Sequence, residues 1–223
     1  LPGVAGIETI NQFHQQLFKD PGSGGLGTFE GNILRSEIDD AGEAAGLDFK
    51  VDCLVNRRGE VTDLFAGPFK TTHRLGAEAA REHYGIPYAS GYDIAVSNAY
   101  GKASEGAIAA FLALMALNPG GEGIGVIIMD APEGQVPHYV FRSWGQEYGG
   151  SQYQHYQPGT RFVPAIMKKL ILLNPYPDRT CADLICHPDD LIMTRTWEET
   201  LAVLKQDFPE TARAAVILDG TMQ

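Results

Sequence analysis

Short apolar runs alternate with helical patterns along residues 88–223, and this alternation restricts the possible folds more than any other feature of the chain. A short apolar run enclosed by turn signals is typical of a strand that is buried on both faces, as in a parallel sheet. Helices between such strands predict crossover connections. We therefore expect an α/β fold with a doubly wound, mainly parallel sheet, with strands at 92–96, 124–129, 170–173, 191–193 and 214–218 and helices at 105–117, 162–169 and 197–207.

Residues 1–87 have a different pattern and are predicted to form a separate domain. Asn32 is placed to cap a helix that stops at Gly46. Alternating residues from Phe49 to Ala66 then predict a β-hairpin. A further helix is expected from Lys70 to Tyr84, before Gly and Pro residues mark the boundary near Ile86. The two predicted domains therefore cover residues 1–87 and 88–223.

The composition indicates which partners the protein can have. A formal net charge of −11, without a concentrated basic patch, argues against binding to nucleic acid or to an anionic membrane surface. The longest apolar run, residues 107–117, is about half of the roughly twenty residues that a membrane-spanning helix needs. The three cysteines are too few for a disulfide framework and fit a reducing compartment. We expect a cytoplasmic protein that acts on small molecules.

The carboxyl ends of the predicted strands supply the candidate binding residues. Ligands of doubly wound sheets lie at these ends. Three loops follow them, at 97–102, 130–134 and 174–176, and only the first combines a cation, an amide and an aromatic ring. A carboxylate substrate would use Lys102 for charge, Asn98 for a hydrogen bond and Tyr100 as a wall. The alternative is a solvated lysine beside a turn.

His14 is the candidate metal ligand. Val4, Ile7, Ile10 and Phe13 form an apolar stripe at roughly helical spacing, and His14 lies at the edge of that stripe. A histidine in this position can direct one ring nitrogen into a cleft. The alternative is a half-buried histidine that makes ordinary hydrogen bonds, since a metal site normally needs several ligands. His73 and His83 are predicted to serve as cap or packing residues of the helix that carries them.

Several stretches between Leu1 and Gly76 resemble the nickel-dependent lactate racemase family. They are Leu1-Pro2-Gly3, the helix that ends at His14, Gly31-Asn32-Ile33-Leu34, Ala45-Gly46-Leu47-Asp48-Phe49, Phe65-Ala66-Gly67 and Thr72-His73-Arg74-Leu75-Gly76. The resemblance implies that His14 binds the nickel of a nickel-pincer nucleotide. It also implies that residues 1–87 are the C-terminal part of the cofactor-binding lobe. The lysine that tethers the cofactor and the histidine bases would belong to an N-terminal segment that precedes Leu1.

The resemblance implies a reaction as well. The family inverts the hydroxyl-bearing carbon of a 2-hydroxy acid by hydride transfer to the cofactor and back. Where lactate racemases carry a glutamine and a lysine on a helix that faces the substrate, this chain has Ile108 and Phe111. Their tryptophan after the long loop corresponds to Phe162. These departures predict a racemase or epimerase of a 2-hydroxy acid other than lactate, whose side chain lies against Phe111 and Phe162. The alternative is a cofactor-free binding or regulatory relative with the same fold.

Overall fold

The chain forms two compact units that meet in the sequence between Gly85 and Ile86. The structure is a computed structural model, and it describes residues 5–6, 8–9, 12–13, 28–87, 89–106, 112–136, 167–178 and 191–221. Within these residues, no helix is both long enough and apolar enough to cross a membrane. Each unit is described by itself below.

The first unit contains one β-hairpin and two helices. Its elements are α2 (Ile33–Ala44), β1 (Phe49–Val55), β2 (Val61–Pro68) and α3 (Phe69–Tyr84). The Asn32 side chain accepts hydrogen bonds from the backbone N–H groups of Leu34 and Arg35 at 3.0 and 3.2 Å, which confirms the predicted cap. The two strands pair antiparallel with Cys53 opposite Leu64, so the predicted hairpin is also confirmed.

One face of this hairpin packs against α3. Gly76 of α3 lies over the ring of Phe65, where an added Cβ atom would be 3.6 Å from the ring. At the far end of the helix, the Tyr84 hydroxyl donates to the carbonyl of Val55 at 2.7 Å and accepts from its N–H at 2.8 Å. An ion pair between Lys70 and Glu43 connects α3 to α2. α3 therefore holds the strands from one side, and α2 is attached to α3.

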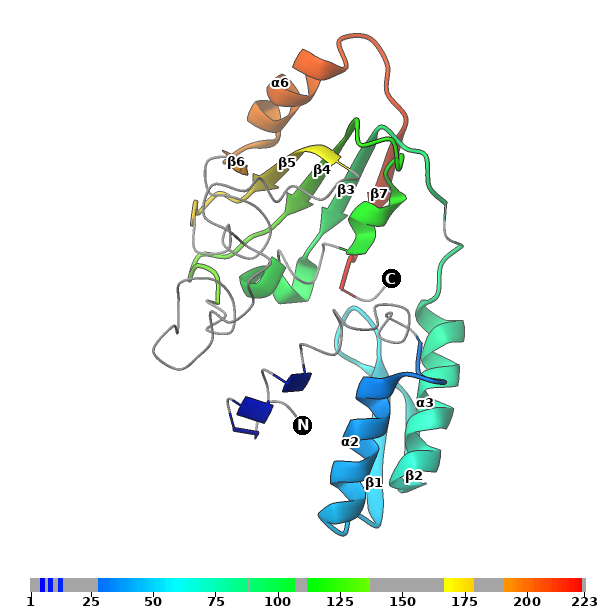
Figure 1. Cartoon of the computed structure of the whole chain (residues 1–223). Helices are drawn as coiled ribbons and strands as arrows, with labels where there is room; N and C mark the ends of the chain where they lie inside the picture. Colours follow the sequence, from blue (N-terminus) through cyan, green and yellow to red (C-terminus); the bar gives the residue numbers. More distant parts are fainter. Residues whose placement is uncertain are drawn as a thin grey trace. The chain divides into compact units, whose positions relative to one another are not determined.

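The second unit is built on a five-stranded sheet (Figure 1). Its strands are β3 (Ile94–Asn98), β4 (Gly123–Ile128), β5 (Met167–Leu173), β6 (Leu191–Thr194) and β7 (Ala214–Ile217). They lie in the order β6-β5-β4-β3-β7, and every neighbouring pair is parallel. The predicted parallel α/β sheet is confirmed.

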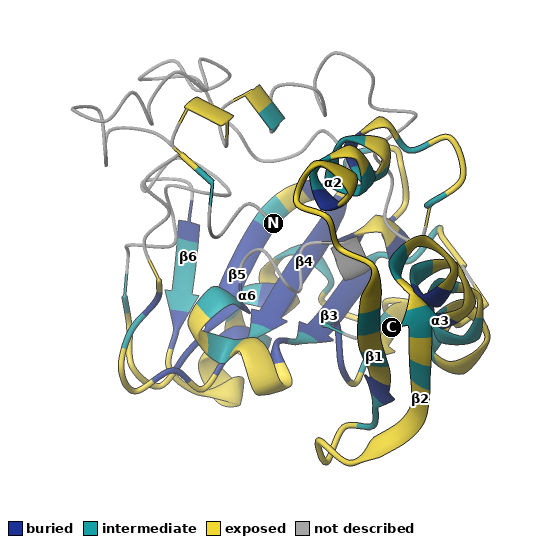
Figure 2. Cartoon of the chain, turned by 90° about the horizontal axis from the view of Figure 1, so that it is seen from below, coloured by how far each residue is buried: buried dark blue, intermediate teal, exposed yellow. Residues whose placement is uncertain are grey.

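Apolar side chains cover both faces of the central strands. On one face, Leu114, Ile127 and Leu170 belong to a cluster of fully buried residues, and on the other face Ile124 and Ile171 pack with Leu204 of α6 (Trp197–Asp207). The buried colour of β3, β4 and β5 in Figure 2 follows from this double coverage. A strand that is apolar at successive positions can be buried only in this way, because its side chains alternate between the faces.

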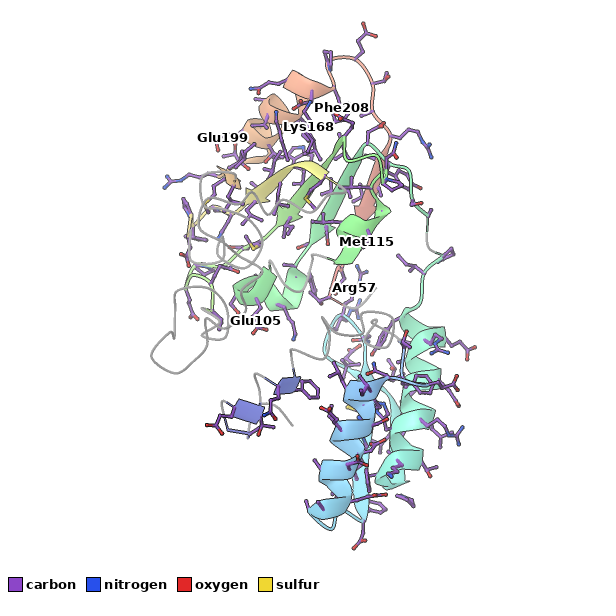
Figure 3. All side chains as sticks on the ribbon, viewed as in Figure 1. Arg57, Glu105, Met115, Lys168, Glu199 and Phe208 are labelled. Atoms are coloured by element: carbon purple, nitrogen blue, oxygen red, sulfur yellow. The ribbon has the colours of Figure 1, made fainter. Side chains whose placement is uncertain are left out.

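Polar contacts hold both ends of α6. Thr196 accepts a hydrogen bond from the Glu199 N–H at 3.2 Å, which is one half of the predicted capping box. The Glu199 carboxylate accepts from the Arg195 N–H at 2.6 Å, one residue before the cap, and not from the N–H of Thr196 as a full capping box requires. At the other end, Asp207 lies between the ammonium groups of Lys168 and Lys169, at 2.8 and 2.5 Å. The two lysines hold the pKa of Asp207 below its ordinary value. In Figure 3, Glu199 and Phe208 mark the two ends of this helix.

Several of the predicted boundaries differ from those of the structure. The helix predicted at 162–169 conflicts with β5, which already includes residues 167–169; residues 162–166 lie outside the described part of the chain. The periodicity of a short apolar run does not distinguish a strand from a helix. β3 covers 94–98 rather than 92–96, so Ser97 and Asn98 end a strand instead of opening a loop. Within the helix predicted at 105–117, the described residues Leu112–Ala116 form a 3-10 helix. β7 ends at Ile217, one residue before the predicted end of that strand.

The double-sided burial of β5 predicts the effect of a truncation there. Leu170 is 0 % exposed in the centre of the sheet, whereas Leu218, just past β7, is 59 % exposed. Leu170→Ala should lower the free energy of unfolding by about 2–5 kcal/mol, because it leaves a cavity that its neighbours fill only in part. Leu218→Ala is the matched control and should change stability by no more than about 0.5 kcal/mol. Urea unfolding of both variants measures the difference, and equal effects would contradict the assignment of the core.

Candidate functional site

The strand order places a topological switch point between the parallel strands β3 and β7. From β3 the chain proceeds through β4 and β5 to β6 on one side, and β7 then pairs on the other side of β3. In open parallel sheets, ligands bind outside the carboxyl ends of the strands at such a switch point. The carboxyl ends of β3 and β7 are joined there by a hydrogen bond of 2.9 Å from the Gly220 N–H to the Asn98 carbonyl. This edge is therefore the candidate site.

Asn98 and Tyr100 form a tight turn at the end of β3. The Asn98 side-chain oxygen accepts a hydrogen bond from the Tyr100 N–H at 2.9 Å, which leaves the amide nitrogen as the side-chain group that can donate to a ligand. Tyr100 has φ of +41°, and it is the only non-glycine residue with a positive φ in the described part of the chain. Residues other than glycine adopt this conformation at a cost and mainly where the surroundings impose it, often at functional sites. The Tyr100 side chain is half-exposed.

Lys102 follows in the 3-10 helix η2 (Tyr100–Glu105). Its backbone N–H donates to the Ala99 carbonyl at 2.9 Å, which fixes the turn below it. The ammonium group lies 3.8 Å from the Glu105 carboxylate, and the side chain is 63 % exposed. A long, exposed ion pair of this kind holds the lysine weakly. The charge of Lys102 is therefore available to an anionic ligand at the carboxyl end of β3.

Gln135 connects this turn to the two other candidate loops. Its side-chain N–H group donates to the Ala103 carbonyl at 2.6 Å, and its backbone N–H donates to the Asp178 carboxylate at 2.7 Å. A third hydrogen bond, of 2.8 Å, runs from the Val136 N–H to the Ser104 carbonyl. The structure thus brings together the three loops that the sequence placed after β3, β4 and β5. The sequence analysis missed Gln135 and Asp178, since no local pattern distinguishes them.

Buried polar atoms without partners also lie at this edge. Asn174 lies directly after β5 and is 1 % exposed. Its side-chain oxygen accepts a hydrogen bond from the Tyr176 N–H at 3.0 Å, in the same way as the Asn98 side chain accepts from the Tyr100 N–H. Among the described residues, its amide nitrogen and the side-chain oxygen of Gln135 have no hydrogen-bond partner. A buried polar group that lacks a partner is costly. These two amides are therefore further candidates for contact with a ligand or an internal water molecule. The position of Asn174 after an apolar strand was a usable signal in the sequence.

Other predicted site residues lie outside the part of the chain that the structure describes. They are His14, Ile108, Phe111, Arg161 and Phe162. Across the described ranges, no group of three or more His, Cys, Asp or Glu side chains is arranged to hold a metal ion. These ranges thus provide no test of His14 as a ligand. A role for it in cofactor binding remains a prediction.

The two described histidines of α3 make packing contacts. The ring of His73 meets Phe29 edge-on, with centroids 6.4 Å apart, and the ring of His83 meets Tyr84 at 4.9 Å. Burial, with the nearby charge of Arg35 next in importance, lowers the pKa of His73 from its ordinary value of 6.5. Burial thus disfavours the charged form of His73, in agreement with the predicted packing role.

The positive φ of Tyr100 can be tested by two substitutions. Tyr100→Gly and Tyr100→Ala both remove the ring, but only glycine adopts φ of +41° without strain. The glycine variant should therefore be the more stable of the two by about 1 kcal/mol. Thermal unfolding of the two variants in the same buffer measures the difference. A more stable alanine variant would show that the backbone at this turn is not strained.

Comparison with known proteins identifies the fold. No protein-family model matches the chain, and no curated protein sequence matches it. Among solved structures, the lactate racemase apoprotein from Thermoanaerobacterium thermosaccharolyticum is similar, with a TM-score of 0.72 and 16 % sequence identity. The similarity covers 96 % of this chain and 54 % of that chain, so this chain spans about half the length of the solved protein. On this likeness, together with its parallel sheet flanked by helices, the chain has a lactate racemase-like fold.

Proposed function

We propose that this chain is the C-terminal portion of a racemase or epimerase that acts on a 2-hydroxy acid and uses a nickel-pincer nucleotide. The observation that carries the proposal is the extent of the fold likeness, since nearly the whole chain matches a lactate racemase apoprotein. The sequence resemblance around His14 supports it independently. When bound, the cofactor would accept and return the hydride, and the protein would supply orientation and charge.

The loop after β3 would bind the carboxylate of the substrate. The exposed ammonium group of Lys102 would supply the charge, and the Asn98 amide nitrogen would donate a hydrogen bond. The half-exposed ring of Tyr100 would form a wall beside them. Gln135 would hold this loop in place through its hydrogen bond to the Ala103 carbonyl.

The side chain of the substrate would be larger or more apolar than that of lactate. Ile108 and Phe111 replace an amide and a positive charge of lactate racemases with apolar groups. A carboxylate that is buried against such groups needs another cation, because an unpaired buried charge costs several kcal/mol or more. Lys102 would fill this role, with Arg161, beside Phe162, as the second choice. The substrate side chain would then lie against Phe111.

The remaining parts of the reaction would come from outside these 223 residues. By the family resemblance, the lysine that tethers the cofactor and the histidine bases would lie outside these 223 residues. We therefore assign no general base to this chain, and we expect the 223 residues alone to be inactive. The substrate, the cofactor and the polypeptide that supplies these groups would be its partners.

Nickel analysis tests the proposed cofactor. Full-length protein from cells that make the cofactor should contain stoichiometric nickel, and His14→Ala should abolish its retention because a ligand is lost. His83→Ala is the matched control, since His83 packs on Tyr84 and should not be needed for nickel retention. Stoichiometric nickel in the His14 variant would rule out its role as ligand. Wild-type protein without nickel would instead favour a cofactor-free binding or regulatory relative.

Kinetics with a series of 2-hydroxy acids test the proposed substrate site. In the full-length holoenzyme, Lys102→Ala should raise KM by about tenfold to a hundredfold, because a hydrogen bond to a charged group is lost. Lys205→Ala, at an exposed position of α6, is the control and should leave KM unchanged. Long aliphatic or aromatic 2-hydroxy acids should react faster than lactate. A clear preference for lactate, or full activity of the Lys102 variant, would contradict the proposed pocket.

A further inference from the structure

Most of the buried polar atoms that lack a partner lie at the carboxyl edge of the five-stranded sheet. Across the described ranges, five buried side-chain nitrogen or oxygen atoms make no hydrogen bond. One belongs to His73 of the first unit, and the other four belong to Ser97, Gln135, Asn174 and Asp219. These four residues lie at the end of β3 or after β4, β5 and β7. Because native proteins leave few such atoms, their concentration at one edge indicates that a ligand or ordered water completes their hydrogen bonds.

Asp219 and Ser97 lie on one face of this sheet, at the switch point. Ile217 is half-buried, Leu218 is exposed and Asp219 is 0 % exposed. Side chains alternate between the two faces along a strand, so Asp219 shares the covered face with Ile217. Ser97 is the Cα partner of Ile217, and it is also fully buried. The carboxylate and the hydroxyl group therefore belong to the same side of β3 and β7.

The chain after β7 keeps Asp219 beside the end of β3. The N–H of Gly220 donates to the Asn98 carbonyl at 2.9 Å, so the residue next to Asp219 is tied to the first residue of the binding turn. β3 and β7 lie side by side and run in the same direction (Figure 1). Asp219 therefore borders the proposed substrate site.

The two carboxylate oxygens of Asp219 have different surroundings. Oδ1 accepts hydrogen bonds from the N–H and from the hydroxyl group of Thr221, at 3.1 and 2.6 Å. Oδ2 has no partner among the described residues. Two hydrogen bonds to Oδ1 restrict the rotation of the carboxylate, so Oδ2 is held in one orientation. A buried oxygen of this kind is costly unless a donor reaches it.

The donors and acceptors of the two residues indicate which group fits between them. Oδ2 of Asp219 accepts hydrogen bonds, whereas the hydroxyl group of Ser97 can donate one as well as accept. A hydroxyl group on a ligand can donate to the first and accept from the second. An ammonium group brings three donors, for which these two residues supply only two acceptor atoms. A hydroxyl group is therefore the better match.

We propose that Asp219 and Ser97 form a subsite for a second hydroxyl group, on the side chain of the 2-hydroxy acid. That hydroxyl group donates to Oδ2 of Asp219 and accepts from the hydroxyl group of Ser97. The inference rests on the proposed function, since it concerns the same substrate site, and it adds the chemical class of the side chain. Asp219 and Ser97 determine specificity here and move no proton in the reaction.

The binding of two acids of equal size tests the subsite. 2,4-Dihydroxybutanoate and 2-hydroxypentanoate differ only in a terminal hydroxyl or methyl group. In calorimetry with racemic acids and the full-length holoenzyme, the dihydroxy acid should have a Kd about tenfold lower, because its hydroxyl group donates to a carboxylate. Asp219→Asn leaves an oxygen for Thr221 but places an amide nitrogen, which donates, where Oδ2 accepted. This variant should remove most of the preference.

The ratio of the two Kd values separates a contact with the ligand from a structural role. A structural role of Asp219 would change both Kd values by the same factor, whereas a lost contact changes only that of the dihydroxy acid. Ser97→Ala is a second variant of the subsite, and it should lower the preference several-fold. Asp63→Asn removes a carboxylate from an exposed position of β2 and is the matched control, with an unchanged ratio.

Three results would overturn the subsite. If the wild-type protein binds both acids equally well, or if both variants of the subsite keep the preference, the subsite is wrong and the proposed function stands. Tighter binding of 4-amino-2-hydroxybutanoate than of the dihydroxy acid would show that Asp219 pairs with a cation instead. If neither acid binds to the wild-type protein, the proposed function is itself wrong, and the subsite falls with it.

Discussion

The burial of β3, β4 and β5 between two apolar layers is the interaction on which the rest of the structure depends. Ile124 and Ile127 point to opposite faces, and both are fully buried. Each fully buried side chain of this kind contributes about 1.5–3 kcal/mol to folding. Because the strands are covered on both sides, polar loops lie at the strand ends, and ligands of such sheets bind at the carboxyl ends. The burial that stabilises the sheet therefore confines the site to the strand ends, and the strand order selects the carboxyl ends of β3 and β7.

The local sequence patterns predicted the elements of the fold well. Each of these elements is indicated by residues that lie close together in the sequence. Examples are the hairpin, the helix cap at Thr196 and the apolar strand at Ile124. The stretch at 167–169 was assigned to the wrong element because Met167, Lys168 and Lys169 fit a helix or a strand equally well. Its pairing with β4 decides between the two, and pairing is a long-range interaction that the local pattern does not contain.

The candidate site was only partly predictable for the same reason. Asn98 and Lys102 were found because they follow a strand with a clear pattern. Gln135 was not, since its contacts with Ala103 and Asp178 join segments 32 and 43 residues apart in the sequence. The residues next to Gln135 in the sequence form no pattern that indicates these partners.

The double attachment of Gln135 has a consequence for the motions of the binding edge. One side chain and one backbone N–H group tie the loops after β3, β4 and β5 together. None of these loops can swing outward alone without breaking a partly buried hydrogen bond. Such a bond is lost at a greater cost than an exposed one. The three loops should thus open and close as one body, and a ligand that orders the turn at Tyr100 would at the same time order the segment around Asp178.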